Sequence, residues 1–228
     1  TFLDTVEINS QTVKTVDELK PNALVVFAGS GTLTEVAGAK LTGGTNGTVS
    51  SSDYTDYFKA LETADFNYLA LPTSDNTIKK AGINFIKRMR EDEGKNAQLV
   101  IADSDADSEA VINVSNGVIL ADGTVIDKTK ATVWVASASA SAGIEKSLTY
   151  AKYDDSVDVD GKLTHTETID ALLKGKFVFT YKKGRAVVEQ DINSLVSFTI
   201  EKNEFFKKNR VLRTLDDIVN DTQYAFTE

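Results

Sequence analysis

A stretch rich in glycine, serine and threonine, GSGTLTEVAGAKLTGGTNGTVSSS, divides this chain into regions with different hydrophobic patterns. It spans residues 29–52 and has little periodicity, which is typical of a linker. We therefore predict a domain boundary near residue 42. Residues 1–41 are interpreted as the remnant of a β-rich N-terminal region and its linker. The reason is that TFLDTVEINSQTVKTV and ALVVFAG have strand patterns on either side of a short helical VDELK.

Beyond the linker, helix and strand patterns alternate. The sequence predicts helices over 51–64 and 73–94, with Ser74 as the N-cap of the second, and short buried strands over 66–72 and 97–103. Alternation of this kind implies parallel strands joined by crossover helices. The segment from 42 to 144 is therefore predicted to be a central α/β layered domain.

The second half of that domain contains turn signals. In EAVINVSNGVILADGTVID, the tripeptides SNG and ADG predict hairpins between short antiparallel strands. The next segment, KTKATVWVASASASAG, is compatible with a strand by its valine and threonine content, or with a helix by its length and small residues. We favour a helix that packs closely on the sheet and ends at Gly143.

Residues 145–228 predict a C-terminal α+β domain that is truncated at its end. Thr164 and Glu167 have capping-box spacing at the start of a helix that stops at Gly175. KFVFTYKKGRAVVEQ predicts a hairpin, and NEFFKKNRVLRTLDDIVND predicts the last helix. The expected buried seam of that helix is Phe205, Leu212, Leu215 and Val219. The predicted fold class is thus α/β and α+β, after a partial β-rich N-terminal unit.

Composition limits the classes of function. The chain has no cysteine, which excludes disulfides, thiolate metal sites and thiol nucleophiles. Its formal net charge is -9, which argues against nucleic acid as a partner. No apolar run approaches the ~20 residues of a membrane span, so we expect no membrane association. The sequence begins without methionine and already in strand-like alternation, so we interpret it as a fragment.

Candidate metal and proton-transfer residues do not form a complete motif. His165 is the single histidine, and we expect it to be an exposed residue in the first turn of a helix. The acidic run DSDADSEA begins like a calcium loop, but Ser108 and Val114 occupy the places of the required glycine and bidentate glutamate. We assign no metal site and expect an acidic loop after a strand.

Nucleotide and catalytic motifs are also incomplete. The glycine-rich segment lacks the lysine of a phosphate-binding loop, and Thr34 replaces the third glycine of the dinucleotide fingerprint. Nothing selects a pair of carboxylates for glycoside hydrolysis among the 34 acidic residues. We therefore predict no cofactor and no enzymatic activity.

A longer pattern resembles a known family. KLTGGTNGTVSSSDYTDYFKALETADFNYLALPTSD is followed by FIKRMREDEGKNAQLVIA, VINVSNGVILADG, TVWVASASASAG and SLTYAKYDDSVDV. The pattern closes with FVFTYKKGRAVVEQDINSLVSFTIEKNEFFKKNRVLRTLDDIVND. In order and spacing these segments, from about residue 40 to 223, resemble the sheath protein of contractile phage tails and R-type bacteriocin particles. The segment that begins at VEQDINSL is the most diagnostic.

The resemblance implies a structural and mechanical function. Such subunits stack as six-membered rings into a helical sheath around a tail tube, and the sheath contracts to drive the tube through the target envelope. The implied partners are other copies of the chain, the tube protein, and the baseplate and terminator proteins, in the tail of a virion assembled in the bacterial cytoplasm. The terminal arms of related sheaths are missing here, so we expect the fragment to lose much of its capacity to polymerise, with a monomer as one outcome.

A basic cluster stands out in this acidic chain: Lys207, Lys208, Arg210 and Arg213. One interpretation is a solvated helix face, in which Arg213 pairs with Asp217 four residues on. The other, which uses the resemblance, is an interface with an acidic protein surface, because charge contacts favour register and reversible release. Both interpretations stay open at this point.

A second class of function is a non-enzymatic, tail-associated module that binds a cell-surface ligand. Such modules tend to be rich in strands and to expose clustered aromatic residues. Here Trp134 is the single tryptophan and lies in an apolar segment of small residues, which favours the sheath interpretation.

Overall fold

The computed structural model describes residues 6–8, 11–13, 15–20, 30–32, 47 and 49–226, and the chain divides into two compact units, 1–48 and 49–228. In the first unit, β1 (Val6–Ile8) pairs antiparallel with β2 (Gln11–Val13), and a 3-10 helix, η1 (Val16–Glu18), follows. The strand pattern and the short helix predicted here are confirmed. The predicted strand ALVVFAG and most of the predicted linker lie outside the described residues.

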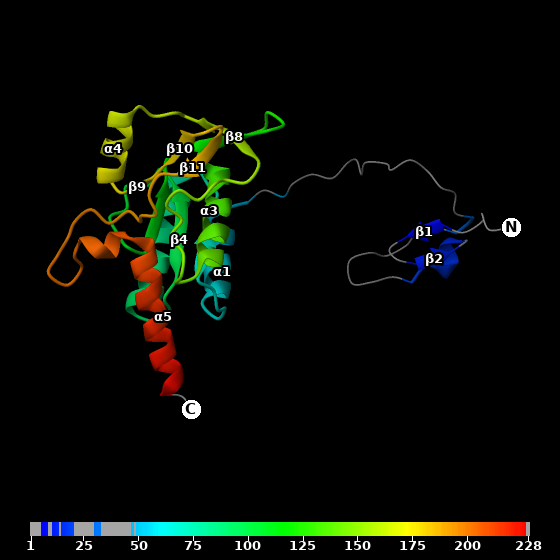
Figure 1. Ribbon diagram of the computed structural model, residues 1–228. Coiled ribbons are helices and arrows are strands. Elements are labelled where there is room, and N and C mark those ends of the chain that lie inside the picture. The colour runs from blue at the N-terminus through cyan, green and yellow to red at the C-terminus, as the bar shows by residue number, and fades with distance from the viewer. Residues whose placement is uncertain are drawn as a thin grey trace. The chain divides into compact units, whose positions relative to one another are not determined.

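A four-stranded parallel sheet forms the centre of the second unit (Figure 1). Its strands are β3 (Tyr68–Ala70), β4 (Gln98–Ala102), β5 (Val111–Val114) and β9 (Lys176–Phe177), in that spatial order. Every residue of β4 is buried, as expected for a parallel strand with helices over both faces. The predicted parallel α/β arrangement is confirmed.

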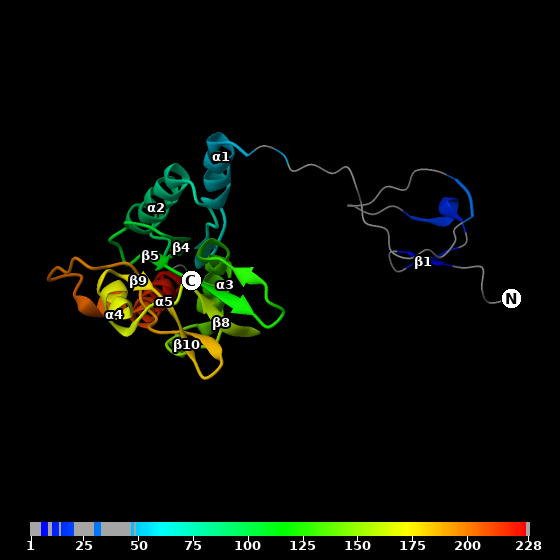
Figure 2. The same cartoon turned by 90° about the horizontal axis from the view of Figure 1, so that it is seen from above.

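Helices cover the two faces of this sheet (Figure 2). Leu99 of β4 packs in one hydrophobic cluster with α1 (Ser51–Leu61) and α2 (Asn76–Glu91). The next residue, Val100, packs in a second cluster with α3 (Lys128–Ala142). Successive side chains of a strand point to opposite faces, so α1 and α2 lie on one side of the sheet and α3 lies on the other.

Carboxylate caps define the starts of α2 and α3. Asp75 precedes α2 and accepts hydrogen bonds from two backbone N–H groups in its first turn. The prediction of Ser74 as the N-cap is therefore wrong by one residue. The carboxylate of Asp75 caps the backbone N–H groups as a serine hydroxyl would, and its negative charge also interacts favourably with the helix dipole. Asp127 caps α3 in the same way, and Gly143, with a φ of 52°, follows its last residue. The predicted helix in this segment is confirmed.

A second, antiparallel sheet contains β6 (Gly117–Leu120), β7 (Val125–Ile126) and β8 (Ser156–Asp160). The predicted hairpin at ADG is confirmed, since β6 and β7 pair on either side of this turn. The predicted hairpin at SNG is wrong, because β5 and β6 belong to different sheets. The buried amide of Asn116 exchanges hydrogen bonds of 2.7 and 2.8 Å with the backbone of Phe179, which directs the chain away from β5 at this point.

The helix predicted near residue 165 is α4 (His165–Leu173), and its capping box is confirmed. Thr164 Oγ1 accepts from the backbone N–H of Glu167, whose carboxylate in turn accepts from the backbone N–H of Thr164 at 2.8 Å. Gly175, with a φ of 70°, follows the helix, as the sequence predicts.

The hairpin predicted in KFVFTYKKGRAVVEQ is also confirmed. It consists of β10 (Phe179–Lys182) and β11 (Arg185–Val188), and its turn residues Lys183 and Gly184 have φ values of 50° and 79°. Two consecutive residues with positive φ are what a tight two-residue turn requires.

The predicted domain division between residues 144 and 145 stays a prediction. Residues 49–228 form one compact unit by their contacts. Across the predicted boundary, β9 joins the parallel sheet through the register pair Val114 and Phe177.

Candidate protein interface at the start of the last helix

The predicted basic cluster is divided between two elements. Glu204–Lys207 forms a 3-10 helix, η2, which begins where the side chain of Asn203 accepts a backbone hydrogen bond. Lys208 is the N-cap residue of α5 (Asn209–Ala225). The predicted last helix included Lys207, but the α-helix begins only at Asn209.

Lys207 binds the C-terminal end of the neighbouring helix α4. Its half-buried Nζ donates to the carbonyl oxygens of Leu172 and Leu173, at 2.8 and 3.4 Å, at the end of α4. A cation at a helix C-terminus satisfies free carbonyl groups and interacts favourably with the dipole. Burial, and then the charge of Lys208, lower the pKa of Lys207. This residue therefore has an intramolecular function.

Lys208 and Arg210 are exposed. Lys208 Nζ lies 3.3 Å from Oε1 of Gln190, and Arg210 Nε donates to the carbonyl oxygen of Ile144 at 3.3 Å. Within the part of the chain that the structure describes, neither residue forms an ion pair. Both positive charges thus face solvent with only neutral partners.

Arg213 is buried, with 8% of its surface exposed. Its Nη2 lies 3.0 Å from Oδ2 of Asp191, so the expected pair with Asp217 is wrong. Nε and Nη2 also donate to the carbonyl oxygens of Gly143 and Lys146, both at 2.7 Å. Burial alone would lower the pKa of the guanidinium, but the interactions with Asp191 and Tyr68 together outweigh it and the pKa is raised. Arg213 is therefore a charged internal residue.

Asp191, the ion-pair partner of Arg213, could not be predicted from the sequence. Its carboxylate also accepts from the backbone N–H of Leu148 at 3.0 Å and from Nδ2 of Asn209 at 2.9 Å. The available signal was weak: Asp191 is one of two acids, with Glu189, in the largely buried run from Val187 to Leu195. A buried carboxylate needs several donors, and these come from segments far apart in the sequence.

Only part of the predicted apolar seam of the last helix is buried. Leu212 is 1% exposed, as predicted. The prediction is wrong for three residues, which are exposed: Phe205 (61%), Leu215 (37%) and Val219 (44%). The contact face of α5 is instead partly polar, because Asp216 forms two hydrogen bonds with Arg90, at 2.6 and 2.9 Å. Apolar periodicity does not detect such a face.

The other candidate residues have structural functions. His165 is the exposed first residue of α4, as predicted. In the predicted acidic loop, Asp103 pairs with Lys128, and Asp107 accepts two backbone hydrogen bonds. Across the described residues, no three side chains of metal-binding type gather into a possible ion site. None of the helices in the described part has the length and apolar character that a membrane crossing requires.

Comparison with known proteins identifies relatives over most of the chain. The family model of the phage tail sheath protein central domain matches residues 47–194. The sheath tail protein of Desulfitobacterium hafniense is 48% identical and superposes with a TM-score of 0.83, over 96% of this chain and 53% of that one.

Two further relatives also match nearly the whole chain. The sheath tail protein Lin1278 of Listeria innocua is 38% identical with a TM-score of 0.77, over 93% of this chain and 50% of that one. The phage-like element PBSX protein XkdK of Bacillus subtilis is 42% identical over 97% of this chain and 52% of its own length. The chain therefore spans about half the length of the relatives that it matches.

Proposed function

Because this chain belongs to the phage tail sheath protein family, we propose that it serves as a structural subunit of a contractile tail sheath. The observation that carries the proposal is the match to the central sheath domain over residues 47–194. The shared fold and 48% identity with the sheath tail protein of D. hafniense support it.

In the proposed assembly, copies stack as six-membered rings into a helical sheath around a tail tube, in the tail of a phage or phage-like particle. Contraction of the sheath drives the tube through the target envelope. The free energy comes from the difference between two sets of contacts between subunits, so no nucleotide is required. The second unit suits movement as a rigid body, because both faces of its parallel sheet are covered.

Within this function, we propose that Lys208 and Arg210 face an acidic surface of the tube or of a neighbouring subunit. Both residues are exposed and have only neutral partners among the described residues, whereas Lys207 and Arg213 are held by contacts within the chain. Charge contacts fix register and can be released, which suits a sheath that slides along its tube.

A chimera tests the proposed function. The matched half of the D. hafniense sheath tail protein is replaced by this chain, and the parent relative is the control. We expect electron microscopy to show rings or tubes for both proteins, because the relative supplies the segments that this chain does not match. If the chimera stays monomeric while the parent relative assembles, the two proteins share a fold but not the capacity to assemble.

A further inference from the structure

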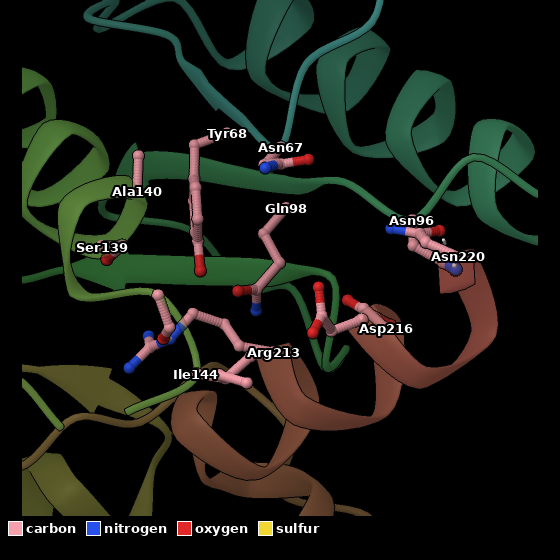
Figure 3. A pocket seen from close by; sticks show the side chains of 12 residues that line it. Asn67, Tyr68, Asn96, Gln98, Ser139, Ala140, Ile144, Arg213, Asp216 and Asn220 are labelled. Carbon is pink, nitrogen blue, oxygen red and sulfur yellow. Dashed lines mark hydrogen bonds between the residues drawn. The ribbon is translucent and has the colours of Figure 1, made fainter. Parts of the chain in front are cut away.

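A small pocket lies between the end of α3, strand β3 and the first half of α5 (Figure 3). Its volume is about 90 Å³. Three of its lining residues come from these three elements: Ser139 from α3, Tyr68 from β3 and Arg213 from α5. The pocket thus lies where the last helix meets the sheet and the helix that covers it.

The same three residues carry unpaired polar atoms. Tyr68 Oη, Ser139 Oγ and Arg213 Nη1 are buried and have no hydrogen-bond partner, and within the described part of the chain no other buried side-chain atom shares this condition. Ser139 is fully buried and Arg213 is 8% exposed. An unpaired buried polar group destabilises the folded state. Three such atoms at one pocket indicate a shared ligand.

The position of Arg213 Nη1 is fixed by the other donors of its guanidinium. Nε is held by the carbonyl oxygen of Gly143, and Nη2 by Lys146 and Asp191. The Tyr68 hydroxyl lies near enough to this guanidinium for each group to shift the pKa of the other, but Oη and Nη1 lack the geometry of a direct hydrogen bond. Water can bridge two polar groups that do not bond to each other directly.

We propose that the pocket is a hydration site in which ordered water bridges Arg213 Nη1, Tyr68 Oη and Ser139 Oγ. The guanidinium nitrogen only donates, so the ligand has to accept there. Both hydroxyl groups can donate or accept, so water can pair with all three atoms. The volume exceeds the ~10–15 Å³ that one water molecule needs.

The surroundings favour water over an anion. Asp216 and Asp217 line the same pocket, and the C-terminal end of α3 contributes partial negative charge. The positive charge of Arg213 is already paired with Asp191. Bridging water connects α5 to β3 and α3, and so positions the helix whose N-terminal end carries Lys208 and Arg210.

Two pairs of variants test the site in urea unfolding of the 228-residue chain. Tyr68→Phe is compared with Tyr57→Phe, at a residue that is 43% exposed, and Ser139→Ala with Ser137→Ala, an exposed serine on the same helix. Loss of one hydroxyl from a hydrated site raises the unfolding equilibrium constant, relative to its control, by about twofold to tenfold. We also expect the double variant Tyr68→Phe/Ser139→Ala to lose less stability than the two single variants lose together, because both hydroxyls bind shared water.

A gain in stability from these substitutions would overturn the proposal. If the pocket is dry, each substitution removes an unpaired polar atom, and stability rises relative to the control. A crystal structure grown in sodium bromide gives the direct test. Density between the three atoms without anomalous signal supports water, whereas an anomalous bromide peak there would assign an anion site instead.

Discussion

Arg213 and Asp191 form a buried ion pair, with 3.0 Å between Nη2 and Oδ2 and side chains only 7% and 1% exposed. Asp191 also accepts from Asn209 in α5 and from the backbone of Leu148, beyond the end of α3. The pair therefore joins the last helix to two segments that lie far from it in the sequence. It fixes the helix from which the two exposed cations project.

Replacing Arg213 by methionine should lower the free energy of unfolding by roughly 3–5 kcal/mol. The substitution leaves the Asp191 carboxylate buried without its cation, which costs more than the pair itself contributes. Urea unfolding measures the loss. Arg210→Met is the matched control, because this exposed arginine lacks a carboxylate partner among the described residues and should change stability by about 0.5 kcal/mol or less. Equal losses in the two variants would show that the buried pair does not hold the helix.

Replacing Lys207 by methionine should loosen the end of α4. The ammonium binds the carbonyl oxygens of Leu172 and Leu173, and a cation at a helix C-terminus contributes about 0.3–1 kcal/mol. Amide hydrogen exchange in the last turn of α4 should therefore be faster than in the unmodified chain. Lys80→Met, an exposed lysine on α2, is the control and should leave α4 unchanged.

Reversing the two exposed charges, Lys208→Glu with Arg210→Glu, should impair assembly of the chimeric sheath. If these residues face an acidic surface, like charges repel, and the concentration needed for assembly should rise by about tenfold or more. The unfolding midpoint should not fall, because neither residue forms an ion pair within the described chain and acidic residues are favourable at a helix N-terminus. Lys80→Glu with Lys87→Glu on α2 controls for the change in net charge. Normal assembly of the first variant would exclude these residues from the interface.

Features that depend on neighbouring residues could be predicted from the sequence. The capping box at Thr164, the turn at Lys183 and Gly184, and the glycine after α3 each follow from chemistry within a few residues. The parallel sheet also followed, because alternating helices and strands leave few ways to cover both faces. Local signals and the fold agree in these segments.

Features that depend on distant partners could not be predicted. Asn116 separates β5 from β6 by bonding to Phe179, 63 residues on, so the turn signal SNG was misleading. The expected pair of Arg213 with Asp217 was wrong for the same reason. Nothing in the neighbourhood of Arg213 indicates that its carboxylate is Asp191 rather than Asp217. The sequence gives the charges of the cluster but not which of them are already paired.

The stability of the chain should depend on pH through Glu109. Burial alone would raise its pKa, but the hydrogen bond from Lys202 and further interactions hold the pKa below the ordinary 4.5. A carboxyl group with a lowered folded-state pKa stabilises the fold above the unfolded value, and this contribution is lost as pH falls through the folded value. The difference in thermal midpoint between the chain and Glu109→Gln should therefore shrink below about pH 4.5. Glu201→Gln, at an exposed site, is the control. A difference that is constant over this range would exclude the ion pair as its cause.

At Gly117, the addition of a single methyl group should cause a large loss of stability. A β-carbon there would lie 2.2 Å from the carbonyl oxygen of Ile126, and this neighbour is backbone that cannot rotate away. Val118 and Ile126 are register partners between β6 and β7, so relief of the clash requires the two strands to separate. We expect Gly117→Ala to lower the free energy of unfolding by roughly 1–3 kcal/mol. Gly47→Ala is the control, because a β-carbon there meets no atom within 4 Å, and it should be nearly neutral. Circular dichroism during urea unfolding measures both variants, and equal midpoints would show that β7 can shift to make room.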